Sequence, residues 1–295
     1  MTTCPNDHLQ TRFARVIAHI DAHADRQLDL PELAGIAAFS PFHFHRQFAA
    51  LFGITATRYI RLVRMRRAAH SLLFRKDIPI TEIAFDAGYE NAESFSRAFR
   101  KLHDQSPSDF RSHPDWDNWQ APYAKLQQIR RNTMTGTESD NVTIIEFPET
   151  RTACMDHIGS PARIGETIQR FIAWRKIHHL HPSKHATFNI LWCNPEDTPA
   201  DEFRMGLAVA TDQVLSEEEN KKGFYCETLP AGRYAKLRHI GNDQTLRDSA
   251  LALYRDWLPH SGETPGDFPL IFQRIAFYPD VAEHEAITDI LLPLA

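Results

Sequence analysis

The stretch IPITEIAFDAGYENAESFSRAFRKLHDQSPSDFR, residues 78–111, decides the fold of the first part of this 295-residue chain. Apolar residues recur at helical spacing from Ile80 to Ala87, and Gly88 then permits a sharp backbone bend. Asn91 is a residue type that caps helix N-termini, and the pattern after it predicts a second helix over residues 92–103. The stretch therefore predicts a helix, a tight turn and a second helix.

The second helix has an apolar face, which contains Phe95 and Phe99, and a polar face at its opening turns. In a major groove, arginine can bond guanine O6 and N7, and the amides of a helix N-terminus can face phosphate. For this segment alone, an amphipathic hairpin with a solvated face is the alternative. This second face carries Ala92, Glu93, Ser96 and Arg97.

A second copy of the pattern favours DNA binding over that alternative. ELAGIAAF, residues 32–39, matches EIAFDAGY, residues 82–89, at an offset of 50. After the turn the offset becomes 51, so that Arg46 corresponds to Arg97. Gly53 ends the second helix of this copy. Two helix-turn-helix units in tandem are thus predicted.

One long helix is predicted between the two copies, from Thr55 to about Phe74. At 1.5 Å per residue it spans about 30 Å, close to the roughly 34 Å between successive major grooves on one face of a duplex. The helix therefore acts as a spacer. Its arginines supply sequence-independent attraction to phosphates, with a merely solvated basic face as the alternative. They are Arg58, Arg61, Arg64, Arg66 and Arg67.

Residues 8–113 resemble the DNA-binding domain of AraC/XylS-type transcription regulators. The resemblance is carried by I-x-x-I-A-x-x-x-G-Y at 80–89, S-F-S-R-x-F-R at 94–100 and P-S-x-F-R at 107–111. It implies base contacts from both recognition helices, while Arg61 and Arg64 of the long helix remain candidates for phosphate contacts on the grounds of their charge. The implied base-contacting residues are Phe42, His45, Arg46, Ala92, Glu93, Ser96 and Arg97; family members often carry longer polar side chains at the positions of Ala92 and Glu93.

Composition is that of a globular protein, with 42% hydrophobic and 24% charged residues. There is no apolar run near 18 residues and no cleavable signal at the start, so we expect a soluble, cytoplasmic protein with no membrane partner. The four cysteines show no close pairing such as C-x-x-C, and reduced thiols are expected.

Charge is distributed unevenly along the chain. Residues 1–115 hold 15 Lys+Arg against 13 Asp+Glu, whereas residues 140–295 hold 15 against 23. Only the first part is therefore a plausible nucleic-acid surface. We expect a DNA-binding domain over 8–113, a linker over 114–140 and a second domain over 141–295.

The second domain contains an internal repeat. Pro148, Arg151, Ala153 and His157-Ile158-Gly159 recur at an offset of 82 as Pro230, Arg233, Ala235 and His239-Ile240-Gly241. Each copy predicts two strands, a helix and two further strands, which gives an α+β domain made of a duplicated ββαββ unit. Two such copies related by a pseudo-twofold axis can merge their sheets and leave a groove suited to a ligand.

This half resembles the GyrI-like effector-binding domain of multidrug-sensing regulators. The motifs are P-A-G-R-Y-A-x-x-R-H-x-G at 230–241, W-L-P-x-S-G at 257–262, N-P-E-D-T-P at 194–199 and T-D-I-x-L-P at 288–293. The resemblance implies a pocket lined by aromatic side chains for a lipophilic, often cationic, molecule. The expected lining residues are Trp174, Phe188, Leu191, Trp192, Tyr254, Trp257, Phe272 and Gln273.

Gln273 departs from the pattern of that family. Relatives commonly carry an acid after the phenylalanine of this strand, placed to meet a ligand cation, whereas this chain has Phe272-Gln273. A neutral amide supplies only hydrogen-bond energy of about 0.5–1.5 kcal/mol, while an uncompensated buried carboxylate is worth several kcal/mol to a cation. We therefore expect a pocket more neutral and more apolar than is usual, with Glu285 as a stray acid.

Metal and enzymatic sites are not predicted. The histidines at 43, 45 and 178–185 lack a helical pair with a carboxylate partner, and no G-x-S-x-G, Walker A or G-x-G-x-x-G motif is present. His157 and His239 end equivalent strands of the two repeats, so capping of a turn explains both. No cofactor is expected, and a hydrolase of reactive small molecules is the alternative function.

These observations predict a ligand-responsive transcription regulator that is not an enzyme. Its partners would be double-stranded promoter or operator DNA and a small lipophilic effector, with RNA polymerase as a further candidate. The competing hypotheses are the hydrolase and a ligand-buffering protein that uses DNA only incidentally.

Overall fold

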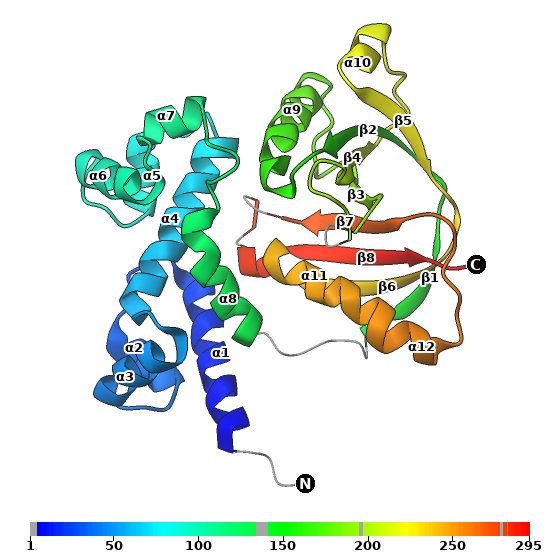
Figure 1. Cartoon of the computed structure of the whole chain (residues 1–295). Helices are drawn as coiled ribbons and strands as arrows, with labels where there is room; N and C mark the ends of the chain where they lie inside the picture. Colours follow the sequence, from blue (N-terminus) through cyan, green and yellow to red (C-terminus); the bar gives the residue numbers. More distant parts are fainter. Residues whose placement is uncertain (1–4, 134–140, 195–196, 278–279, 282) are drawn as a thin grey trace. The chain divides into compact units, whose positions relative to one another are not determined.

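The computed structural model describes residues 5–133, 141–194, 197–277, 280–281 and 283–295, and the chain forms two compact units, Met1–Thr135 and Gly136–Ala295. All described secondary-structure elements of the first unit are helices (Figure 1). Its elements are α1 (Pro5–His23), α2 (Leu30–Ile36), α3 (Pro41–Phe52), α4 (Ala56–Phe74), α5 (Ile80–Asp86), α6 (Ala92–His103), α7 (Pro107–Ser112), η1 (Ala121–Tyr123) and α8 (Ala124–Thr133).

Local sequence signals fix the ends of the recognition helices and the spacer. The Ser40, Thr55 and Asn91 side chains accept a backbone N–H at the starts of α3, α4 and α6. Gly53 ends α3 with φ +69°, the left-handed conformation that glycine adopts most easily. The predicted helix bounds are confirmed to within one residue.

An aromatic core holds the first helix-turn-helix pair, α2 and α3, beside α1. Phe13 of α1 is fully buried, and its ring centroid lies 5.9 Å from Phe44, 6.0 Å from Phe48 and 5.7 Å from Phe52. In the second pair, the rings of Phe95 and Phe99 lie 5.5 Å apart, as those of Phe44 and Phe48 lie 5.7 Å apart in the first. Such ring pairs stabilise a core beyond the area that they bury.

Residues 114–133 do not form the expected linker. They fold as η1 and α8 within the first unit, and α8 packs against α1 and α4. Trp119, Tyr123, Leu126 and Ile129 are buried in the same core as α1. The helix-like pattern up to Asn132 is thus confirmed as α8, and this helix is amphipathic, with Leu126 and Ile129 buried. The rest of the expected linker, 134–140, lies outside the described residues.

The second unit is the predicted α+β domain, built on one eight-stranded sheet in the order β1-β6-β8-β7-β3-β4-β2-β5 with every neighbouring pair antiparallel. Its strands are β1 (Thr143–Phe147), β2 (Thr150–Ile158), β3 (Thr187–Leu191), β4 (Arg204–Ala210), β5 (Phe224–Leu229), β6 (Gly232–Ile240), β7 (Leu270–Ala276) and β8 (Ile287–Pro293). Its helical elements are η3 (Pro161–Arg163), α9 (Ile164–Ile177), α10 (Glu217–Lys221), α11 (Asp243–Ala252), the π-helical η4 (Leu253–Trp257), α12 (Leu258–Ser261) and η5 (Glu283–Glu285).

The two repeats merge into this sheet through β3 and β7, and they exchange their first strands. β1 of the first copy pairs with β6 of the second, and β5 of the second copy pairs with β2 of the first. Neither copy is therefore a complete sheet by itself.

The sheet has a helix-covered face and a helix-free face. α9 packs on one half of the covered face and α11 on the other half (Figure 1). The helix-free face carries Cys154, Phe188, Ile190, Tyr234 and Ile271, all buried. The sheet must curl, because the rings of Phe147 on β1 and Phe188 on β3 lie 6.2 Å apart. Four strand spacings in a flat sheet would separate those strands by about 19 Å.

None of the described helices has the length and apolar character needed to cross a membrane. Among the described cysteines, Cys154 is buried, Cys193 half-buried and Cys226 exposed, and all three are free thiols.

Candidate nucleic-acid interface and candidate ligand groove

The two recognition helices, α3 and α6, lie at opposite ends of α4 and toward the same side of it (Figure 1). All seven side chains expected to contact bases are exposed or half-buried there, and none belongs to the core. The candidate side chains on both recognition helices are therefore at least partly accessible to solvent.

Phe42 is an exposed aromatic ring at the start of α3, with 64% of its surface accessible. The Cζ atom of Arg46 lies 5.0 Å from the centroid of this ring. A cation–π contact of this kind restricts the guanidinium without consuming its N–H donors. Arg46 is thus held beside Phe42 with donors available for a base edge or a phosphate.

A basic hollow of about 590 Å³ opens between α4 and α6. Arg61 on α4 and Arg97 on α6 both line it, and its described lining contains no acidic side chain. Lys101, one turn beyond Arg97, also lines the hollow and was not predicted from the sequence. Its spacing of four residues from Arg97 was the available signal. The arrangement concentrates positive charge beside the second recognition helix.

Arg64 was expected to contact the DNA backbone, but its guanidinium bonds two carbonyl groups of the protein. Its Nε donates to the carbonyl of Ala24 at 2.7 Å and its Nη2 to the carbonyl of Arg26 at 2.6 Å. Burial lowers its pKa from the usual value. Because two of its three nitrogens hold the backbone that precedes α2, Arg64 has a structural role, although its side chain also lines the hollow.

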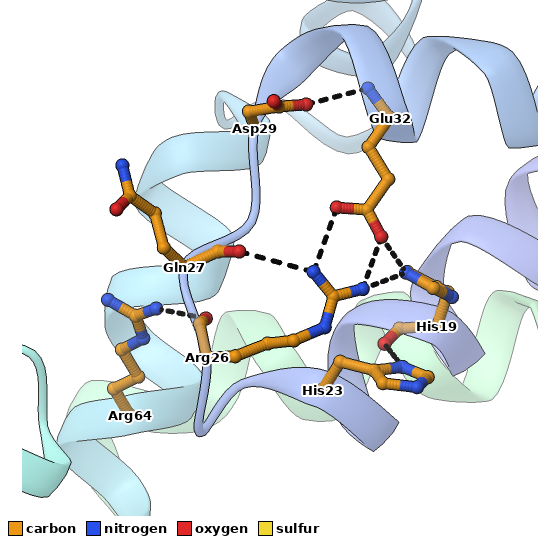
Figure 2. A network of polar contacts seen from close by, with 7 residues as sticks. All are labelled: His19, His23, Arg26, Gln27, Asp29, Glu32 and Arg64. Carbon is orange, nitrogen blue, oxygen red and sulfur yellow. Dashed lines mark hydrogen bonds and ion pairs between the residues drawn. The ribbon is translucent and has the colours of Figure 1, made fainter.

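Figure 2 shows the network that holds this backbone segment. Arg26 forms an ion pair with Glu32 of α2, and His19 of α1 bonds the same carboxylate at 2.7 Å. The Arg26 hydrogen bond is the largest cause of the low pKa of Glu32, about 2. Arg64 reaches the carbonyl of Arg26 from α4. The network therefore connects three helices at the rim of the hollow.

The expected ligand-binding residues do not come together in one pocket. Leu191, Trp257 and Phe272 pack between the sheet and α11. Trp174 packs between the sheet and α9, where its Nε1 donates to Glu219 at 2.6 Å, and Tyr254 is exposed on η4. Only Phe188, Trp192 and Gln273 share the helix-free face.

A hollow of about 410 Å³ adjoins the helix-free face. Tyr234, Phe268 and Pro293 give it apolar walls, and Arg233 and Asp267 also line it. Phe268 contacts Trp192 with ring centroids 5.9 Å apart, so the apolar wall continues to Trp192. We call the surface formed by the hollow and Trp192 the ligand groove.

Two ion pairs lie on the same face. Asp156 of β2 pairs with Arg204 of β4 at 2.7 Å, and the Tyr225 hydroxyl donates to its other oxygen at 2.7 Å. Asp289 of β8 is held by Arg238 of β6 through two hydrogen bonds of 2.7 and 2.9 Å. Sequence reasoning missed these pairs. The signal was a charged residue at an inward position of an otherwise apolar strand.

Gln273 lies between Phe188 and Asp289 in the register of the sheet. The position where relatives carry an acid therefore neighbours a carboxylate that is already paired. Glu285, the expected stray acid, is exposed on η5.

The repeated histidines have structural partners. His157 bonds the Thr167 hydroxyl at 2.9 Å and the carbonyl of Ser160 at 3.0 Å. His239 bonds the Ser249 hydroxyl at 2.8 Å and the carbonyl of Asn242 at 3.3 Å. Each ring thus ties a strand end to the following turn and helix. Within the described part of the chain, no group of three potential ligands is placed to hold a metal ion.

Comparison with protein families confirms both resemblances. A model described as a GyrI-like small molecule binding domain matches residues 140–295, more than half of the chain. A model described as a helix-turn-helix domain matches residues 33–113.

Relatives of each part are known. The probable transcriptional regulator YgiV of Escherichia coli K12 is 31% identical over 156 residues, which are 52% of this chain and 96% of YgiV. The regulatory protein SoxS of the same strain is 38% identical over 96 residues, which are 32% of this chain and 89% of SoxS. The crystal structure of the EcmrR C-terminal domain is similar at 14% identity and a TM-score of 0.44, over 52% of this chain and 97% of that one.

Proposed function

Because the chain belongs to the GyrI-like small molecule binding domain family and also carries an AraC-type helix-turn-helix domain, we propose that it is a transcription regulator whose DNA binding responds to a small ligand. The observation that carries the proposal is the tandem arrangement of α3 and α6 on one side of α4, with the basic hollow beside α6. This arrangement suits two successive major grooves of one duplex.

In this proposal the side chains of the recognition helices have separate tasks. One major groove is contacted by Phe42, His45 and Arg46 of α3. The next is contacted by Ser96 and Arg97 of α6, and Ala92 and Glu93 lie on the same face of that helix. Arg61 and Lys101 bind the phosphates between the two grooves, because both line the hollow. Arg64 is left out of the contact set, since its bonds are internal.

The second unit is proposed to bind the ligand in the ligand groove, at Trp192, Phe268 and Tyr234, with Phe188 and Gln273 further along the same face. The ring contact between Trp192 and Phe268 supports a continuous apolar wall. A ligand alters DNA affinity only if it binds more tightly to one of two states of the chain, and DNA then alters ligand affinity by the same factor.

A binding role is proposed in preference to catalysis. Asp156 and Asp289 are each engaged by an arginine, which leaves neither carboxylate poised as a general acid or base. Turnover of a compound by the full-length protein would favour the alternative, a hydrolase.

The test is selection of binding sites from random duplexes with the full-length protein, followed by footprinting. We expect one chain to protect two adjacent major grooves, about 10 base pairs apart. The variant Arg46→Ala/Arg97→Ala should lose the selected site, whereas Arg255→Ala, an exposed arginine of the second unit, serves as the matched control. Equal affinity for all duplexes would contradict the proposal. Footprinting is then repeated with RNA polymerase present. An extended protected region would support the polymerase as a partner.

A further inference from the structure

The guanidinium of Arg204 lies on the aromatic face of Trp192. Its Cζ atom lies 4.6 Å from the ring centroid of Trp192. Its Nε and Nη2 each lie 2.7 Å from Oδ2 of Asp156, whose Oδ1 accepts from the Tyr225 hydroxyl. A cation on an aromatic face beside a carboxylate is the arrangement by which proteins hold organic cations. In this chain the cation of that arrangement is the Arg204 guanidinium.

A second carboxylate of the helix-free face, Asp289, is also held by an arginine. Arg238 covers both oxygens of Asp289, whose side chain is only 6% exposed. Gln273, next to Asp289 in the register, adds no charge. Asp267 is exposed at the rim of the hollow, where solvent screening leaves a charge pair worth little.

In both pairs the accessible partner is the guanidinium. The Arg204 side chain is 43% exposed against 14% for Asp156, and the Arg238 side chain is 49% exposed. An arginine has five N–H donors, so Arg204 can bond an acceptor on its solvent side while it holds Asp156. Beside Trp192, a ligand therefore meets the exposed guanidinium of Arg204 and the apolar wall that continues to Phe268.

We propose that the ligand of this groove is an aromatic anion, whose ring system packs against Phe268, beside the Trp192 ring whose face Arg204 covers, and whose carboxylate or sulfonate binds Arg204. The inference rests on the proposed function, because it names the class of ligand for the same groove. An organic cation is disfavoured, because Arg204 already occupies the aromatic site and repels a second positive charge.

Three probes of one shape test the charge of the ligand. The anion 1-pyrenebutyrate, the neutral 1-pyrenebutanol and the cation (1-pyrenebutyl)trimethylammonium are titrated into the full-length protein by calorimetry. We expect the anion to bind about ten-fold more tightly than the cation. Arg204→Met should reverse this order, because it removes the anion's partner and releases Asp156 and Trp192 to the cation.

Arg255→Met is the control, because Arg255 forms an exposed pair with Asp256 on η4. It should leave the order unchanged. If Arg204→Met does not fold, as judged by circular dichroism, Arg204→Lys replaces it. That variant keeps the charge, so the anion should still bind more tightly than the cation.

The outcomes distinguish the two proposals. Equal binding of the three probes, or tightest binding of the cation by the unaltered protein, would overturn the anion assignment and leave a small-molecule site in place. If no probe binds to protein that still binds its selected DNA, the ligand groove itself is refuted, and the anion assignment with it.

Discussion

Arg130 and Asp21 form a buried ion pair although they are 109 residues apart in the sequence. The Nε of Arg130 donates to Oδ2 of Asp21 at 2.8 Å, and its Nη2 donates to Oδ1 at 2.8 Å. The Tyr59 hydroxyl also donates to Oδ1, at 3.2 Å. This contact ties α8 to α1 and α4, so the segment that follows the recognition helices is part of the DNA-binding unit.

Asp21→Ala should strongly destabilise the first unit. The variant leaves the Arg130 guanidinium, whose side chain is 1% exposed, without its carboxylate partner. Removing one partner of a buried pair costs about 3–5 kcal/mol. Calorimetry of the full-length protein should show the transition of the first unit at a lower temperature. Asp25→Ala, at an exposed position just beyond α1, is the control, and an equal shift in both variants would contradict the role of the pair.

Arg97→Ala and Arg61→Ala should weaken DNA binding in different ways. We expect Arg97→Ala to cost about 1–3 kcal/mol at the selected site and to relax one base preference, because its guanidinium is proposed to contact a base. Arg61→Ala should weaken binding to all DNA sequences equally. It should also reduce the slope of log K against log salt concentration by about 1. Both are measured by titration of specific and random duplexes at several salt concentrations. Identical behaviour of the two variants would show that Arg97 does not contact a base.

Local patterns predicted most elements of the fold, whereas contacts between distant residues were not visible in the sequence. The caps at Ser40 and Asn91 lie within three residues of their partners, and so they could be inferred. The polar sequence of α8 gave no sign that Arg130 is buried, because its partner is on another helix. The exchange of β1 and β5 between repeats was equally hidden, since pairing depends on chain topology.

The candidate ligand residues show a related limit. Composition marks an aromatic side chain but does not say which face of a strand carries it. Leu191 and Trp192 are adjacent and therefore point to opposite faces, one under α11 and one into the ligand groove. Arg204 and Asp156 were missed because their pairing requires two strands far apart in the sequence.

His103 should make the first unit less stable in mild acid. Its ring packs on Phe99 and Phe110, and burial lowers its pKa from 6.5 to about 4. The unfolded chain therefore binds a proton near pH 6.5, whereas the folded chain does not until about pH 4. The neutral ring therefore makes its full contribution to the free energy of unfolding above pH 6.5. As the pH falls from 6.5 toward 4, that free energy decreases by up to about 3 kcal/mol.

His103→Gln tests this account, because glutamine can still bond the Tyr123 hydroxyl, 2.7 Å from Nε2 of His103, but does not titrate. We expect the melting temperature of the first unit to fall less between pH 7.5 and pH 5 in this variant than in the unaltered protein. His113→Gln, at an exposed position, should show the full fall. A pH dependence unchanged by His103→Gln would place its origin elsewhere.

Gln273→Glu should shift the preference of the ligand groove toward cations. The new carboxylate would lie beside Phe188 and next to Asp289, whose charge Arg238 already neutralises. It would thus add a negative charge without a partner of its own, at pH values above its pKa. We expect the pyrenyl ammonium probe to bind several-fold more tightly, and pyrenebutyrate more weakly, than in the unaltered protein. Gln213→Glu, exposed on a loop of the same unit, controls for net charge. If cation affinity is the same in both variants, residue 273 does not face the bound ligand.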